Sequence, residues 1–280
     1  MINQSIKSNT IYSIKITQLQ FDKIRKIVYE ISGINLQNGK EELVQSRLIK
    51  RLKALELSDF DEYLHYIKQD STNNEISLMI DLLTTNKTNF FREYEHFEFL
   101  KKQILPNLKT RKIRIWSAAC SSGEEPYSIA MLLTERLSDI NKWDIRILAT
   151  DLSSIILKKA KEGIYTEEIL SDLPAHISKK NFIVFKNKDG NSYKINDDIK
   201  RMVTFTNLNL IGEWPMHGPF NVIFCRNVMI YFDKKTQQTL VNRFWDLLGH
   251  GDYLFTGHSE SLNGLEHNFK YIQPAIYIKV

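Results

Sequence analysis

The stretch IRIWSAACSSGEEPYSIAMLL, residues 113–133, decides the fold of this chain. Its first residues predict a β-strand, and the small and polar residues after them predict a turn. EEPYSIAMLL then predicts a helix with Pro126 in its first turn, where proline is tolerated. A strand, a turn and a helix in this order are typical of a nucleotide-binding loop. The turn has one glycine, Gly123, whereas loops that cradle phosphates usually have two or three.

Strand-like and helix-like patterns alternate from about residue 110 onward. Strands are predicted in KIRIWSAA, WDIRILATD, the start of FNVIFCRNVMIYF, GDYLFTGHSESL and the closing YIQPAIYIKV. This alternation is typical of a doubly wound parallel sheet of the Rossmann-like kind. Residues 165 to about 205 do not fit it, and FIVFKNKDGNSYKI within them predicts a hairpin with Asp189-Gly190 as its turn. We therefore expect an α/β domain with a small β insertion.

The first third of the chain has a different pattern. Residues 1 to about 15 are polar and aperiodic, which predicts a tail, and helical spacing begins near Leu19. Four short helices are predicted up to about residue 85, with Ser58 or Asp59 as the N-cap of the third. The expected organisation is a tail and an all-helical domain in residues 1–85, followed by the α/β domain in residues 86–280.

Composition restricts the class of protein. The chain has 280 residues with 42% hydrophobic content, and we find no run of the ~18 apolar residues that a membrane span needs. The N-terminus has no apolar core like that of a signal peptide. The two cysteines, Cys120 and Cys225, are too few for a disulfide framework, so we expect a reducing, cytoplasmic location. A net charge of +5 permits an anionic partner but does not require one.

Open α/β sheets bind ligands at the carboxyl ends of their strands. The second predicted strand ends at Asp151, which lies 28 residues after Gly123 (151 − 123). An acid in that place commonly binds ribose hydroxyls, although Asp151 could instead cap the helix that starts near Ser153. Glu124 and Glu125 would repel a pyrophosphate at the helix start. Acidic residues in the first turn also stabilise a helix simply by interacting with its dipole. A nucleoside with positive charge and no phosphate, S-adenosylmethionine, fits this site.

Five blocks of sequence point to a family. They are TTNKTNFFRE (84–93), WSAACSSGEEPYSIAMLL (116–133), ATDLSSIILKKAKEGIY (149–165), GPFNVIFCRNVMIYFD (218–233) and LFTGHSESL (254–262). In these blocks and their order the chain resembles the CheR family of chemotaxis receptor methyltransferases. The resemblance implies S-adenosylmethionine-dependent methylation of glutamate side chains on chemoreceptors. Asn89 and Lys87 depart from the family pattern without removing a site residue.

The resemblance also implies site residues. Those assigned to cofactor binding are Asn86, Thr88, Arg92, Glu125, Asp151, Asn209, Leu210, Cys225 and Arg226. Those assigned to catalysis are Arg92, Arg226 and Tyr231. Because a glutamate side chain has a pKa of about 4.3, the nucleophile is already ionised at neutral pH and needs no general base. The seven histidines form no evident catalytic constellation, no metal is expected, and His258 is interpreted as a core or turn histidine.

Two segments are candidates for partner binding. SRLIKRLK places Arg47, Lys50 and Arg51 on one helix face, which the resemblance makes a docking surface for acidic receptor helices. A solvated face is the alternative. The β insertion is a candidate site for a receptor's C-terminal peptide. Neither a nucleic-acid partner nor membrane insertion is expected.

Three other functions compete with this interpretation. Nucleic-acid amino-methyltransferases usually carry an Asn/Asp-Pro-Pro-aromatic motif after the fourth strand, where this chain has CRNVMIYF. A nicotinamide dehydrogenase is disfavoured because G-x-G-x-x-G is absent. A non-catalytic signalling module that binds S-adenosylmethionine stays open as the alternative.

Overall fold

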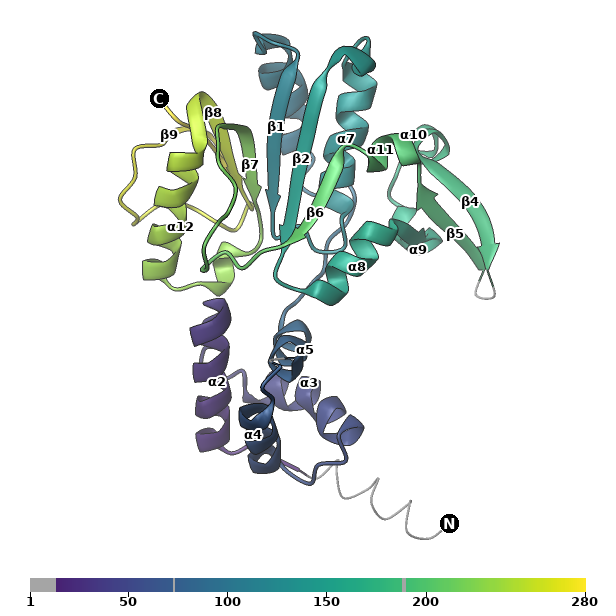
Figure 1. The fold of residues 1–280 in the computed structure, drawn as a ribbon. Helices are drawn as coiled ribbons and strands as arrows, with labels where there is room; N and C mark the ends of the chain where they lie inside the picture. Colours follow the sequence, from purple (N-terminus) through teal and green to yellow (C-terminus); the bar gives the residue numbers. More distant parts are fainter. Residues whose placement is uncertain (1–13, 73, 188–189) are drawn as a thin grey trace. The chain divides into compact units, whose positions relative to one another are not determined.

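The computed structural model describes residues 14–72, 74–187 and 190–280, and most of the predicted tail lies outside them. The chain divides into two compact units, Met1–Thr85 and Asn86–Val280 (Figure 1). In the described residues, no helix combines the length and the apolar character that crossing a bilayer requires.

The first unit is helical, as predicted. Its helices are α2 (Gln18–Ser32), α3 (Glu41–Ala54), α4 (Phe60–Gln69) and α5 (Asn74–Leu83). Thr17 and Gln20 form a capping box at the start of α2, and Gly33 ends that helix in the left-handed conformation. The side chain of Asp59 caps α4, which confirms one of the two predicted N-caps. The apolar faces of the helices form the core of this unit.

The second unit is built on a seven-stranded sheet in the order β6-β2-β1-β7-β8-β10-β9. The strands are β1 (Lys112–Ala118), β2 (Asp144–Asp151), β6 (Val203–Asn207), β7 (Phe220–Cys225), β8 (Leu248–Thr256), β9 (Lys270–Gln273) and β10 (Ile276–Ile278). β10 runs antiparallel to both of its neighbours, while β6, β2, β1, β7 and β8 are mutually parallel. β2 and β7 flank β1 on opposite sides, so the strand order reverses there, as in a doubly wound fold.

The prediction of one closing strand is wrong in detail. YIQPAIYIKV forms two antiparallel strands, β9 and β10. Pro274 cannot donate to a strand ladder, and Ala275 has a positive φ of 61°, so the chain turns back between the two strands.

The longer helices that pack against the sheet include α7 (Glu124–Arg136), α8 (Ser154–Glu162) and α12 (Lys234–Leu247). Right-handed crossovers in opposite directions from the reversal point place α7 and α12 on opposite faces of the sheet. The shorter helical segments are α6 (Glu95–Phe99), η1 (Leu100–Ile104), η2 (Leu105–Asn107), η3 (Ile140–Lys142) and η4 (Met229–Tyr231).

Trp116 on β1 is fully buried, and its indole donates to Thr150 Oγ1 at 2.9 Å.

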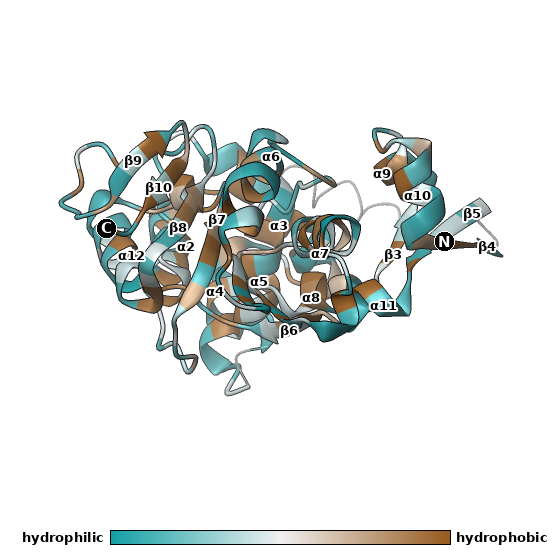
Figure 2. Ribbon diagram, turned by 90° about the horizontal axis from the view of Figure 1, so that it is seen from above, coloured by the Kyte–Doolittle hydropathy of each residue, from teal (hydrophilic) through white to brown (hydrophobic). Residues whose placement is uncertain are grey.

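The β insertion is a separate three-stranded antiparallel sheet in the order β3-β5-β4. It contains β3 (Ile164–Thr166), α9 (Glu167–Leu170), α10 (Ala175–Asn181), β4 (Phe182–Asn187), β5 (Gly190–Ile195) and α11 (Asp197–Lys200). β4 pairs with β5 from Phe182 to Asn187, which confirms the predicted hairpin, although Asp189 of its turn lies outside the described residues. In Figure 2 the β4 ribbon is hydrophobic in colour beside a paler β5.

Candidate functional site

The structure brings the predicted strand ends to one edge of the sheet. Ala118, the last residue of β1, is level with Thr150 on β2 and with Cys225 on β7. Cys225 is in turn level with Thr256, the last residue of β8. The turn after β1, the acid at the end of β2 and the residues after β7 therefore lie along the same edge, where ligands bind in sheets of this kind.

Asp151 supports the turn after β1. Its carboxylate accepts hydrogen bonds from the backbone N–H of Ser121 at 2.8 Å and of Ser153 at 3.0 Å. The N-cap of α8 is Ser153, whose hydroxyl accepts from Ile156 N–H. Asp151 therefore connects the turn after β1 to the start of α8.

Gly123 is required by packing. Its φ of 95° lies in the left-handed region, and a Cβ there would lie 3.0 Å from Ala160 Cβ and 3.2 Å from Tyr165 Oη. The Tyr165 hydroxyl donates to the carbonyl of Ser122 at 2.8 Å, which ties the turn to β3 of the insertion. The single glycine lets the turn pack closely on α8 and the insertion, and this role needs no phosphate.

The two acids at the start of α7 have different surroundings. Glu124 is buried beside the Ser122 hydroxyl, and burial raises the pKa of Glu124 although that hydrogen bond opposes the shift. Glu125 accepts from Ser117 Oγ at 2.7 Å and from Arg226 Nη1 at 2.7 Å. The negative charge at this helix start is therefore partly neutralised within the protein, which the sequence did not reveal.

Arg226 is the centre of a buried ion-pair network with Glu93 and Glu125. Its side chain is 2% exposed, and Nη2 lies 3.0 Å from Glu93 Oε2. Nη2 also donates to the carbonyl of Arg92. Together these bonds use four of the five donors of the guanidinium. Two carboxylates and one guanidinium leave the network with one net negative charge.

Glu93 is held by three groups besides Arg226's Nη2. Asn227 Nδ2 and the His258 backbone N–H each donate to its Oε1 at 3.2 Å, and Arg226 Nε lies 3.3 Å from Oε2. Burial alone would raise the pKa of Glu93, but the charge of Arg226 and these hydrogen bonds outweigh burial and lower it. Glu93 is therefore ionised at neutral pH.

Residues 86–93 form hydrogen bonds to the turn after β1 and to α7. The carbonyl of Asn86 accepts from Ser121 Oγ at 3.0 Å, and Phe91 N–H donates to Ser128 Oγ at 2.9 Å. Arg92 Nη1 donates to the carbonyl of Lys87 at 3.0 Å, which uses one of the five donors of a half-buried guanidinium. Arg92 thus has donors available that Arg226 lacks.

Most of the other predicted site residues lie at or after the carboxyl ends of the strands. Asn209 and Leu210 lie after β6, where Asn209 Oδ1 accepts from Ile211 N–H at 3.2 Å and Leu210 is buried. Tyr231 ends η4 and is half-buried. Cys225 is fully buried, and burial raises the pKa of its thiol, as suits a structural cysteine. Thr88 is half-buried.

Backbone strain concentrates at this edge. Among the described residues, eight that are not glycine have positive φ, and five of them are Phe91, Glu93, Ala119, Ser121 and Asn227. Such conformations cost energy and persist where the surrounding structure fixes them, which is common at functional sites.

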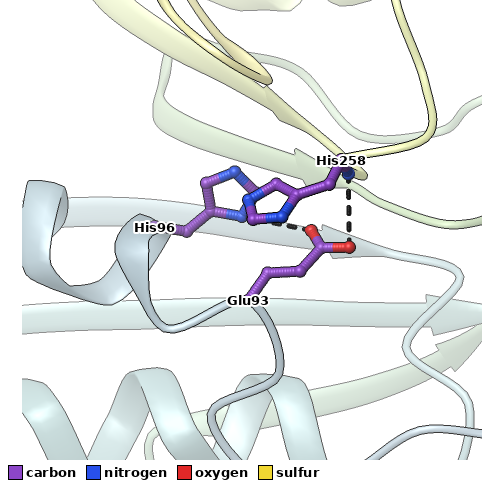
Figure 3. A group of neighbouring side chains, drawn as sticks. All are labelled: Glu93, His96 and His258. Atoms are coloured by element: carbon purple, nitrogen blue, oxygen red, sulfur yellow. Dashed lines mark hydrogen bonds and ion pairs between the residues drawn. The ribbon is translucent and has the colours of Figure 1, made fainter.

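The sequence did not indicate that Glu93, His96 and His258 would meet (Figure 3). His96 on α6 is fully buried, and its ring centroid lies 5.2 Å from that of His258. His258 lies in a turn after β8, as one of its two interpretations held, with 43% of its side chain exposed. The two histidines are far apart in the chain, and no local spacing connects them.

The basic helix differs from its prediction. Arg47 Nη1 donates to the carbonyls of Leu83 at 2.7 Å and Thr84 at 2.9 Å, so it caps the end of α5. Arg51 makes two bonds, of 2.9 Å and 2.6 Å, to the carboxylate of Glu75. The two arginines therefore connect α3 to α5 within the helical unit, which neither the docking-surface nor the solvated-face interpretation anticipated. Lys50 is exposed.

Known proteins resemble both units. The model "CheR methyltransferase, all-alpha domain" matches residues 19–84, and "CheR methyltransferase, SAM binding domain" matches residues 86–278. A chemotaxis protein methyltransferase of Borreliella burgdorferi is 42% identical over 95% of this chain and 96% of the relative. One of Escherichia coli is 37% identical over 94% of this chain and 91% of the relative. The chain therefore belongs to the CheR family of S-adenosylmethionine-dependent methyltransferases.

Proposed function

We propose that this chemotaxis methyltransferase transfers methyl groups to glutamate side chains of chemoreceptors and forms glutamate methyl esters. The observation that carries the proposal is the contrast between the two arginines at the sheet edge. Arg226 is buried and engaged by Glu93 and Glu125, whereas Arg92 is half-buried with donors to spare. A guanidinium with free donors beside a cofactor turn is suited to bind a carboxylate.

The residues present fit S-adenosylmethionine. We assign Asp151, the acid at the end of β2, to the ribose hydroxyls. The Glu93, Glu125 and Arg226 network has one net negative charge, which favours a cationic ligand over a phosphate. Asn86, Thr88, Asn209, Leu210 and Cys225 are the further contacts we assign to the cofactor.

The reaction needs orientation more than acid–base chemistry. When bound, S-adenosylmethionine would supply an activated methyl group on its sulfonium, which a carboxylate oxygen could accept with a neutral thioether as the leaving group. The substrate glutamate is ionised at neutral pH, so no base is required. We assign Arg92 to hold one substrate oxygen while the other attacks, with Tyr231 beside it.

Arg226 then acts through Arg92. It donates to the Arg92 carbonyl and pairs with Glu125 at the start of α7, so it connects the substrate-orienting segment to the cofactor turn. In this proposal Arg226 is a positioning residue and does not touch the substrate.

The partner surfaces need a revised assignment. Because Arg47 and Arg51 are occupied within the helical unit, Lys50 is the residue of the three that we propose for contact with acidic receptor helices. We also propose that a receptor's C-terminal peptide adds to β4, an edge strand whose Ile183 and Val184 are 54% and 56% exposed. A cytoplasmic location follows from this substrate.

The test is transfer of a labelled methyl group from S-adenosylmethionine to a chemoreceptor cytoplasmic fragment, followed by mild alkali. We expect label that alkali releases, because a carboxyl methyl ester is hydrolysed. Alkali-stable label would move the acceptor to nitrogen or carbon. Cofactor binding by calorimetry without transfer to any receptor fragment would favour the non-catalytic signalling module.

A further inference from the structure

Glu93, His96 and His258 form a cluster of metal-ligating side chains. Glu93 is shared with the ion-pair network of Arg226, whereas the side chains of the two histidines have no role in the site described above. One donor atom from each of the three residues lies within 4.8 Å of the other two. They come from two short segments, the start of α6 with the residues before it and the turn after β8, as Figure 3 shows. Glu95 Oε2 lies 3.9 Å from His258 Nε2 and adds a second carboxylate at the rim.

His96 supplies an independent observation that points to a ligand. It is 0% exposed, and within the described chain neither of its ring nitrogens has a hydrogen-bond partner. Its Nδ1 lies 3.6 Å from Glu93 Oε2, beyond hydrogen-bonding distance. A buried polar group without a partner costs about 1–3 kcal/mol and calls for an explanation.

The charges around the cluster are compatible with a cation. Arg226 contributes one positive charge, while Glu93, Glu125 and Glu95 contribute three negative charges. The sum of minus two offsets a divalent ion.

We propose that His96, His258 and Glu93 bind a divalent ion of the zinc class. Two imidazoles and one carboxylate are a known ligand set for such ions, with a fourth position left for water. Zinc–nitrogen bonds are about 2.0–2.1 Å, so the donors must close in from their present span. His258 can make that movement because it lies in a turn with 43% of its side chain exposed. Glu93 must then share Oε2 with Arg226.

This sharing has a consequence that rests on the proposed function. The ion competes with Arg226 for Glu93, and Arg226 positions the backbone of Arg92. Occupancy of the site should therefore slow methyl transfer, which makes the cluster an inhibitory metal site.

Calorimetric titration of the full chain with Zn²⁺, together with the visible absorption of bound Co²⁺, tests the site without relying on activity. His258→Ala is the chosen variant because His258 lies at the surface, whereas the buried His96 could disturb folding. We expect His258→Ala to lower Zn²⁺ affinity by more than the roughly 10–100-fold that loss of an outer-shell partner costs, and to remove the spectrum of tetrahedral Co²⁺. His250→Ala, an exposed histidine at the opposite end of β8, is the matched control and should bind like the parent.

Equal affinity of the two variants, or no stoichiometric binding by the parent chain, would overturn the proposal. Binding lost in His258→Ala without any effect of Zn²⁺ on methyl transfer would keep the site and reject the inhibitory consequence. A protein that binds Zn²⁺ but methylates no receptor would retain the site and reject the proposed function.

Discussion

Arg51 and Glu75 provide the sharpest test of how the helical unit is stabilised. The side chain of Glu75 is 5% exposed, and Arg51 makes two charge-assisted bonds to it. Tyr63 Oη also donates to Glu75 at 2.9 Å. In Arg51→Met the carboxylate stays buried and loses its cation, which typically costs about 3–5 kcal/mol. That is comparable with the whole stability that a core of roughly 70–80 residues supplies.

Lys50→Met is the matched control. It removes the same charge from the neighbouring position of the same helix, and methionine is a good helix former. Lys50 is exposed, so its substitution should change stability by no more than about 0.5 kcal/mol. In the double variant Arg51→Met with Glu75→Met, an apolar pair replaces the ion pair and should recover part of the loss. The recovery is incomplete because the buried Tyr63 hydroxyl loses its acceptor.

The assay separates the two units. The four tryptophans, at positions 116, 143, 214 and 245, all lie in the unit Asn86–Val280. Tryptophan fluorescence during urea unfolding therefore reports that unit, while far-ultraviolet circular dichroism reports both. We expect Arg51→Met to lose helical signal at lower urea with little change in the fluorescence midpoint. The same circular dichroism curve for Arg51→Met and Lys50→Met would refute the reasoning.

Four further predictions concern the other unit. Arg92→Ala should reduce turnover far more than cofactor affinity in steady-state kinetics and calorimetry, whereas equal losses would place Arg92 on the cofactor. Asp151→Asn should weaken cofactor binding by about 10–100-fold, since a charged hydrogen bond contributes about 1.5–3 kcal/mol; unchanged calorimetry would remove Asp151 from the ribose. Because burial raises the pKa of Glu124, this side chain contributes stability below its ordinary pKa of 4.5, and the contribution is lost as pH rises through the folded-state pKa. In Glu124→Gln the melting temperature should therefore fall less steeply as pH rises above 4.5. Parallel profiles of melting temperature against pH for the parent and the variant would contradict this. Val184→Asp on β4 should weaken binding of a receptor C-terminal peptide in fluorescence anisotropy without changing cofactor affinity, and a loss of both would indicate misfolding.

Much of the fold could be predicted because it follows from local patterns. Each strand of the parallel sheet can be predicted from its own apolar run and from the small or polar residues that end it. The doubly wound topology then places Asp151, Cys225 and the turn that contains Gly123 at one edge of the sheet. Spacing after the turn indicated Asp151 as a ribose ligand, whereas the other site residues were assigned from the family resemblance alone.

The errors arise where side chains meet across long distances in the chain. Helical spacing showed that Arg47 and Arg51 share a face, but it carries no information on what that face packs against. In the structure it is α5, with Glu75 as one partner. His96 and His258 meet only because α6 and the end of β8 are neighbours in space, so the sequence gives no signal of the cluster.

The central claim is esterification of a glutamate carboxylate at the sheet edge. The most direct measurement is tandem mass spectrometry of a chemoreceptor fragment after reaction with this protein and S-adenosylmethionine. The account predicts a single methyl addition on glutamate side chains that disappears after mild alkali and is lost with Arg92→Ala. A methyl group on any other residue type, or full transfer by Arg92→Ala, would contradict it.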